Sequence, residues 1–207
     1  MQRLPGKVYY LHQKELQNKF LKMAHIQVPE GVPGIRSLVM FRPETGKSLY
    51  ALVQILLRGE SPLTEAEREL ISAYVSFRNE CMFCMSSHAA AARCLYGNDA
   101  GIVDEVLKDM QQSGVSEKMK SLLDIAGKVQ ILGKEVKPED IEAARSLGAN
   151  DREIHDTVLI AATFSMFNRY VDGLATWAPD DPQFYRDRGA HLAREGYPVG
   201  GTGTALR

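Results

Sequence analysis

Two cysteines and a histidine stand at a spacing that suits thiol chemistry. They lie in the segment CMFCMSSH as Cys81, Cys84 and His88. At about 100° per residue, a helix that includes Cys81 places all three side chains in a sector roughly 60° wide. Unpaired backbone N–H groups and the positive end of the helix dipole lower the pKa of a thiol at such a helix start, which favours the nucleophilic thiolate. His88 lies one turn after Cys84 and is placed to exchange a proton with it.

This arrangement predicts redox chemistry. A thiolate that attacks a peroxide becomes a sulfenic acid, and a second cysteine three residues away can capture it as a disulfide. The third cysteine, Cys94, falls near 220° on the same wheel, outside that sector. We therefore expect Cys94 to be a bystander to the pair, a small buried hydrophobic residue outside the site.

A carboxylate on the preceding helical segment is a candidate partner for the histidine. Glu69 lies twelve residues before Cys81, and the small side chains of Ser72, Ala73 and Ser76 flank its face. Small residues there would let the cysteine helix pack closely. A carboxylate near His88 would fix the imidazole tautomer and raise its basicity.

The segments that must position Glu69, the two cysteines and His88 all have sequence patterns typical of helices. Residues 43–57 carry apolar residues at helical spacing and end before Gly59, and the sequence Thr64-Glu65-Ala66-Glu67 is a capping box that opens a helix reaching to about Arg78. The cysteine helix should begin at residue 81 or 82 and end at 95. Further helices are predicted over 35–41, 99–112, 116–132, 138–147, 151–175 and 182–194. No segment alternates with period two, so the predicted fold class is all-α.

Composition restricts the functional classes. The chain has 207 residues, a net charge of −1 and three cysteines. The charge balance argues against nucleic-acid binding, and the odd, low cysteine count fits a reducing compartment. No signal-peptide pattern and no long apolar run occur, so we expect a cytoplasmic protein without a membrane span. We expect a single domain over 1–207, with a weak polar helix over 8–25 and a mobile tail around 200–204.

The pattern Glu69-x11-Cys81-x2-Cys84-x3-His88 resembles the active-site signature of the alkylhydroperoxidase D-like (AhpD-like) proteins of the carboxymuconolactone decarboxylase superfamily. Residues 61–88 are similar to the peroxidase-related branch in particular, as are Asn168-Arg169 and Asp172-Gly173. The resemblance covers an AhpD-like core at 35–178, with an N-terminal extension at 1–34 and a C-terminal one at 179–207.

The resemblance implies an all-helical fold of packed helix pairs that assembles as a homo-trimer or homo-hexamer. It implies that Cys84 is the peroxide-attacking thiol, Cys81 the resolving thiol, His88 the proton-transfer partner and Glu69 the distant base. No bound cofactor and no metal are implied. The substrate would be a small hydroperoxide, and the reductant an external dithiol such as a dihydrolipoyl protein, in an antioxidant role. Phe83 departs from the His or Tyr common in relatives and removes one polar group beside the site.

Several alternatives remain open at this stage. Cys81, Cys84 and His88 could hold structural zinc if His25, His155 or Glu69 supplied a fourth ligand. The cysteines could be inert and buried, or could sense redox state in a non-enzymatic helical oligomer. The remaining hypothesis is a decarboxylase-like or lactone-type reaction, by analogy with the superfamily, although that chemistry does not require paired thiols.

Overall fold

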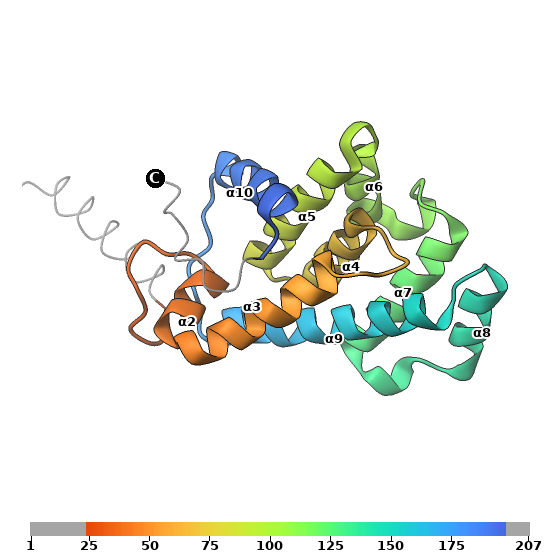
Figure 1. Cartoon of the computed structure of the whole chain (residues 1–207), viewed down its shortest axis with the longest axis horizontal. Helices are drawn as coiled ribbons and strands as arrows, with labels where there is room; N and C mark the ends of the chain where they lie inside the picture. Colours follow the sequence, from red (N-terminus) through yellow and green to blue (C-terminus); the bar gives the residue numbers. More distant parts are fainter. Residues whose placement is uncertain (1–23, 198–207) are drawn as a thin grey trace, which may run out of the picture.

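The structure is a computed structural model that describes residues 24–197, and Figure 1 shows their arrangement. These residues form α-helices and short 3₁₀ turns, and no strand occurs among them. The predicted all-α fold class is therefore confirmed for this part of the chain. The predicted helix over 8–25 lies almost entirely outside the described residues, and the predicted mobile tail lies wholly outside them.

The helix bounds follow the sequence pattern closely. They are α2 (Ile35–Phe41), α3 (Pro43–Arg58), α4 (Glu65–Arg78), α5 (Met82–Tyr96), α6 (Gly101–Asp109), α7 (Glu117–Ile131), α8 (Pro138–Ser146), α9 (Asp151–Gly173) and α10 (Pro182–Glu195). The single helix predicted over 99–112 is wrong, because a separate 3₁₀ turn follows α6 at Met110–Gln112. Asp109 causes the break, since its carboxylate accepts hydrogen bonds from the amides of Gln111 and Gln112.

The helix that carries Glu69 lies at the centre of the fold. Thr64 and Glu67 form the predicted capping box at its start. From Ala66 to Ser76 nearly every side chain of α4 is buried, because α3, α5, α7 and α9 all pack against it. Ser72, Ala73 and Ser76 are completely buried, as the close packing of α4 and α5 requires. Glu69 is thus held in the protein interior by the helix on which it sits.

Helix α10 packs along α5 (Figure 1). Gly189 makes the close approach possible, because a Cβ atom at that position would lie only 2.6 Å from the Cβ of Ala90. Tyr185, Arg188 and Leu192 are buried in the same contact. The described part of the predicted C-terminal extension is therefore packed against the cysteine helix.

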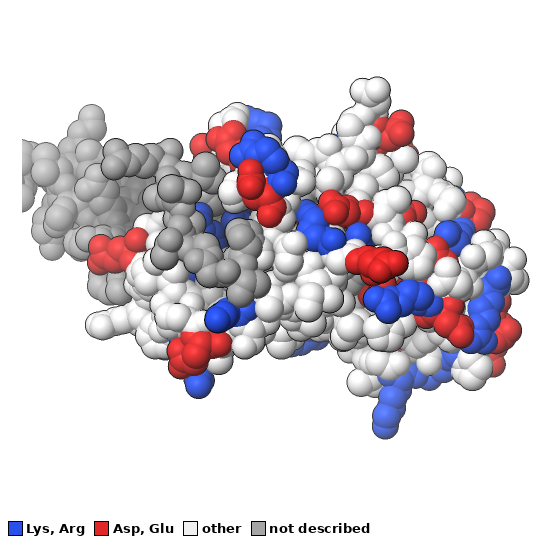
Figure 2. Space-filling view, in the orientation of Figure 1, with Lys and Arg blue, Asp and Glu red and all other residues white. Residues whose placement is uncertain are grey.

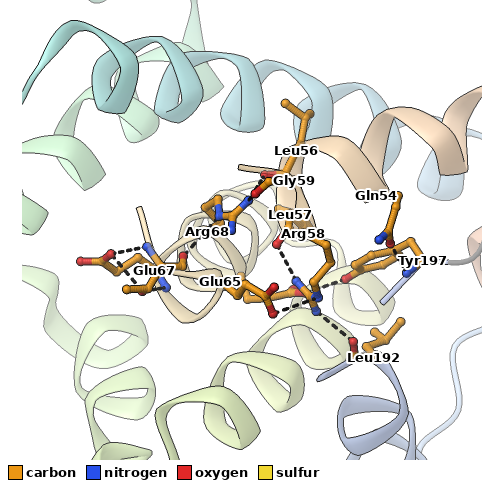
Figure 3. A network of polar contacts seen from close by, with 12 residues as sticks. Gln54, Leu56, Leu57, Arg58, Gly59, Glu65, Glu67, Arg68, Leu192 and Tyr197 are labelled. Atoms are coloured by element: carbon orange, nitrogen blue, oxygen red, sulfur yellow. Dashed lines mark hydrogen bonds and ion pairs between the residues drawn. The ribbon is translucent and has the colours of Figure 1, made fainter. Parts of the chain in front are cut away.

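A buried arginine joins the end of α3 to the start of α4 (Figure 3). The Nη1 atom of Arg68 donates hydrogen bonds to the carbonyls of Leu56 (3.0 Å) and Gly59 (2.9 Å), and its Nε donates to the carbonyl of Thr64 (3.3 Å). The last carbonyls of a helix have no partner within the helix. Arg68 satisfies those of α3 and so fixes the turn that precedes α4.

Charged side chains on the surface are mixed in sign. On the face in Figure 2, Lys and Arg lie among Asp and Glu. Several charged side chains form exposed ion pairs, as Arg145 does with Glu142 and Asp151. In the part of the chain that the structure describes, no helix combines the length and the apolar character that crossing a membrane demands.

We predict that Arg68→Met lowers the free energy of unfolding by about 2–4 kcal/mol, because it leaves buried carbonyls at the end of α3 without a donor. Urea unfolding followed by circular dichroism measures this change. Arg145→Met is the control, since its ion pairs are exposed and its loss should cost less than about 0.5 kcal/mol. Equal effects of the two substitutions would contradict the role given to Arg68.

Candidate active site

Both cysteines of the pair lie at the start of α5, and both are buried free thiols. Cys81 is the residue that caps the helix, and its backbone amide donates a hydrogen bond to the carbonyl of Ser76 (3.0 Å). Cys84 lies one turn further and lines a small pocket together with His88, whereas Cys81 does not line it. The two thiols therefore differ in access, and Cys84 is the one that a molecule in the pocket would meet.

His88 and Glu69 form a buried pair. The Nδ1 atom of His88 lies 2.7 Å from Oε2 of Glu69, and Glu69 is completely buried. An ionised carboxylate has no proton to give, so Nδ1 carries the proton and donates it to Glu69. This arrangement leaves Nε2 as the basic nitrogen, as in other carboxylate–histidine pairs. The ring edge of Phe164 packs against the imidazole with centroids 4.5 Å apart. The expected proximity of Glu69 and His88 is confirmed.

Glu69 has two further partners, Arg58 and Tyr197, which are labelled in Figure 3. Arg58 donates from Nη2 to Oε1 of Glu69 at 2.6 Å, and the hydroxyl of Tyr197 donates to the same oxygen at 2.8 Å. Burial raises the pKa of Glu69, but the charge and hydrogen bond of His88, the charge of Arg58 and the Tyr197 hydrogen bond together hold it below its usual value. The carboxylate thus stays ionised inside the protein.

Arg58 is fixed by groups from three elements. Its guanidinium donates to the carbonyls of Leu57 (2.9 Å) and Leu192 (3.0 Å) and lies 3.4 Å from the Glu65 carboxylate. Burial lowers the pKa of Arg58, but the charge of Glu69 leads the contributions that raise it above its usual value. Sequence reasoning missed Arg58, because a basic residue in the last turn of a helix normally only caps that helix.

Tyr197 was also missed by sequence reasoning. Its backbone amide donates to Oε1 of Gln54 (2.6 Å), and its ring stacks beside His88, with Arg58 over its face. Burial, followed by the charge of Glu69, raises the pKa of Tyr197 well above its usual value, so the phenol remains a donor. It follows Gly196, which has φ +67° and turns the chain back after α10. An isolated aromatic residue between glycine and proline gives no periodic signal.

The pKa of the Cys81 thiol shifts in the direction opposite to the one that the sequence predicted. The pKa of Cys81 is raised, first by its hydrogen bond with Cys84, then by burial and by its electrostatic interaction with Cys84. The Cys84 backbone amide lowers it, as expected at a helix start, but is outweighed. The expectation of a lowered pKa is therefore wrong for Cys81. Cys81 keeps its proton and is the hydrogen-bonding partner of Cys84.

Residues of α9 that belong to the predicted resemblance surround the loop before Cys81. Asn168 donates to the hydroxyl of Ser76 (3.0 Å) and accepts from the amide of Asn79 (2.9 Å). Burial raises the pKa of Asp172, and a hydrogen bond with Cys81 opposes that shift. Asn168 thus anchors the loop that places Cys81, and Asp172 lies beside the Cys81 thiol.

Cys94 corrects one expectation. It is exposed rather than buried, because it lies in the last turn of α5, beyond the all-alanine stretch of 89–92 that packs inside the protein. Its expected separation from the site agrees with the pocket lining, which does not include it.

The pocket is small and mostly apolar. Its volume is about 30 Å³, which is enough for one or two water-sized groups. The lining residues are Ile35, Val39, Leu49, Tyr50, Val53, Cys84, His88, Phe164, Phe167, Arg188 and Tyr197. The pocket is therefore lined by residues of helices α2, α3, α5, α9 and α10 and by Tyr197, which follows α10.

The zinc alternative finds no support in this geometry. Within residues 24–197, no three His, Cys, Asp or Glu side chains are arranged to hold a metal ion. His25 and His155, the proposed fourth ligands, are exposed, and His155 is hydrogen-bonded to Asp156. Glu69 is already occupied by His88, Arg58 and Tyr197.

Residues 43–128 match the model of the carboxymuconolactone decarboxylase family. The predicted resemblance is confirmed. The matched segment contains Glu69, Cys81, Cys84 and His88, whereas Arg188 and Tyr197 lie beyond it. A search of curated proteins found no match.

The fold is similar to solved structures. An alkylhydroperoxidase AhpD core, described as an uncharacterized peroxidase-related protein from Ralstonia eutropha JMP134, has 25% identity and a TM-score of 0.68, covering 90% of this chain and 91% of that one. An uncharacterized peroxidase-related protein from Silicibacter sp. TM1040 has 28% identity and a TM-score of 0.68, covering 91% and 92%. A protein of unknown function from Agrobacterium tumefaciens, described as a putative antioxidant defence protein AhpD, has 20% identity and a TM-score of 0.58, covering 70% and 97%, and shows the fold alone.

We predict that Glu69→Gln lowers the free energy of unfolding at neutral pH by about 3–5 kcal/mol, because it removes the closer and fully buried of the two carboxylates that pair with Arg58. The folded-state pKa of Glu69 lies below the usual 4.5. Its stabilisation is therefore complete above that pH and is lost as pH falls through the folded-state pKa. Denaturant unfolding of both proteins across this range should show the difference shrinking in acid.

The matched control is Glu65→Gln, which loses a longer ion pair to the same Arg58 at an exposed position. It should cost less than about 1 kcal/mol. A Glu69→Gln effect that stays constant down to the lowest pH would contradict an ionised Glu69.

Proposed function

We propose that the protein is a thiol-dependent peroxidase that reduces organic hydroperoxides through the Cys81–Cys84 pair. The observation that carries this proposal is that Cys84 and His88 line one pocket while buried Glu69 holds the far side of the imidazole. The family match and the peroxidase-related names of the structural neighbours support the same chemistry. The proposed reaction needs no bound cofactor.

In the first step His88 takes the proton of Cys84. Its Nδ1–H is bound to Glu69, so Nε2 is the nitrogen available to the pocket, one helical turn from the thiol. Negative charge on Glu69 stabilises the imidazolium that forms. Arg58 and Tyr197 keep the carboxylate in place and ionised, so they act as positioning residues.

The Cys84 thiolate then attacks the terminal oxygen of the hydroperoxide. An S–O bond forms and the O–O bond breaks, so the sulfur is oxidised by two electrons and the peroxide is reduced to its alcohol. The alkoxide that leaves takes the proton from His88. The apolar lining from Val53, Phe164 and Phe167 excludes bulk water, which strengthens the electrostatic interactions inside the pocket.

Cys81 resolves the sulfenic acid. Its thiol is already hydrogen-bonded to Cys84 and keeps its proton until the sulfenic acid has formed. The attack forms a Cys81–Cys84 disulfide and releases the sulfenic hydroxyl as water, which takes its second hydrogen from the Cys81 thiol. An external dithiol, such as a dihydrolipoyl protein, then restores both thiols by exchange.

The other predictions about biology stay predictions. They are the cytoplasmic location, the homo-trimer or homo-hexamer, and the identity of the hydroperoxide. A non-enzymatic redox sensor would form the same disulfide without steady-state peroxide consumption, so turnover with a dithiol donor separates it from an enzyme. A decarboxylase-like activity would survive alkylation of the thiols, whereas the proposed activity would not.

The cysteine assignments predict three different outcomes. Cys84→Ser should lower the turnover of an organic hydroperoxide by more than about a thousandfold, because the attacking atom is removed. Cys81→Ser should reduce one equivalent of hydroperoxide and then stop, because no disulfide can form. Cys94→Ser is the matched control and should leave steady-state turnover unchanged. Full turnover by Cys84→Ser would exclude the assignment.

Tyr197→Phe should move the acid limb of the pH profile of kcat/KM to higher pH. The Tyr197 hydrogen bond lowers the pKa of Glu69. Its loss therefore raises that pKa, so Glu69, the base of the Glu69–His88 proton relay, becomes protonated at a higher pH. Tyr185→Phe is the control, because within the described residues its buried hydroxyl has no hydrogen-bond partner. An unmoved acid limb in Tyr197→Phe would remove Tyr197 from the relay.

A further inference from the structure

A buried arginine from α10 lies in the wall of the pocket. Arg188 is 7% exposed and lines the pocket with Cys84 and His88. Its Nε donates a hydrogen bond to the hydroxyl of Ser87 (3.0 Å), and its guanidinium carbon lies 5.2 Å from the ring centroid of Phe83. Ser87 and Phe83 are neutral, so these contacts orient the guanidinium without neutralising its charge.

No carboxylate among residues 24–197 forms an ion pair with Arg188. The ion pairs among these residues do not include Arg188, and Glu69 is paired with Arg58 and His88 instead. The charge of Arg188 also acts on Arg36 of α2: burial lowers the pKa of Arg36 first, and the charge of Arg188 lowers it further. Arg36 also has no ion pair among the described residues. Buried arginines are normally paired with an anion.

We propose that Arg188 makes the pocket selective for hydroperoxides that carry a carboxylate. This inference rests on the proposed function, since it names the substrate class of the same site. The two terminal nitrogens of a guanidinium match the planar geometry of a carboxylate. The substrate's carboxylate would bind Arg188, with Arg36 from α2 adding positive charge nearby. Its hydroperoxyl group would lie in the small cavity beside Cys84.

Substrate charge is the readout that tests this proposal. We would measure kcat/KM for a short aliphatic hydroperoxide with a terminal carboxylate and for its methyl ester, which has nearly the same shape and no charge. The wild-type protein should prefer the acid. In Arg188→Met, kcat/KM for the acid should fall by about thirtyfold or more while that for the ester changes little.

Three variants separate charge recognition from packing. Arg188→Lys keeps the charge and should retain part of the preference for the acid. Ser87→Ala removes the hydrogen bond to Nε and should retain the preference. Arg186→Met, on the exposed side of α10 where it contacts Gln183, should behave as the wild type does.

Two results would overturn the inference. One is a wild-type protein that reduces acid and ester equally well. The other is an equal loss for both substrates in Arg188→Met, which would mean that Arg188 only stabilises the thiolate or holds α10. If the wild-type protein consumes neither hydroperoxide, the proposed function fails. Calorimetric binding of the corresponding hydroxy acid, compared with its methyl ester and with Arg188→Met, then decides the inference by itself.

Discussion

The site depends on one buried negative charge. Glu69 is fully enclosed, and an ionised carboxylate is stable there only if charged and hydrogen-bonding partners replace the water it has lost. Those partners are Arg58 at the end of α3, His88 on α5 and Tyr197 after α10. The end of α3, helix α5 and the segment after α10 must therefore meet at this carboxylate, although Tyr197 is 128 residues from Glu69 in the sequence.

Several contacts of the fold bring these segments together at Glu69. Arg68 closes the turn between α3 and α4, which sets Arg58 and Glu69 at the distance of an ion pair. The close approach of Gly189 to Ala90 lets α10 lie along α5. The carbonyl of Leu192 on α10 accepts a hydrogen bond from Arg58. The C-terminal segment is thus tied to the relay through the same arginine that balances Glu69.

Residues with local patterns were predictable, and residues that act through tertiary contacts were not. The capping box, the helix bounds, and the proximity of Glu69 to His88 follow from spacing along two helices. Arg58 and Tyr197 carry no such pattern, because their role depends on how distant segments pack. The exposure of Cys94 and the raised pKa of Cys81 were also missed, since a helical wheel shows direction but neither the neighbours present in that direction nor the coupling between two thiols.

The site therefore divides into two parts of different origin. The thiols, His88 and Glu69 lie within the segment that matches the family model, and in our proposal they supply the redox chemistry. Arg188 and Tyr197 come from beyond that segment and complete the pocket wall and the relay. A C-terminal helix that packs on the cysteine helix can change residues facing the pocket without disturbing the Glu69–His88 pair. In our proposals Arg188 of α10 selects the substrate, while Cys84, Cys81, His88 and Glu69 carry out the chemical step.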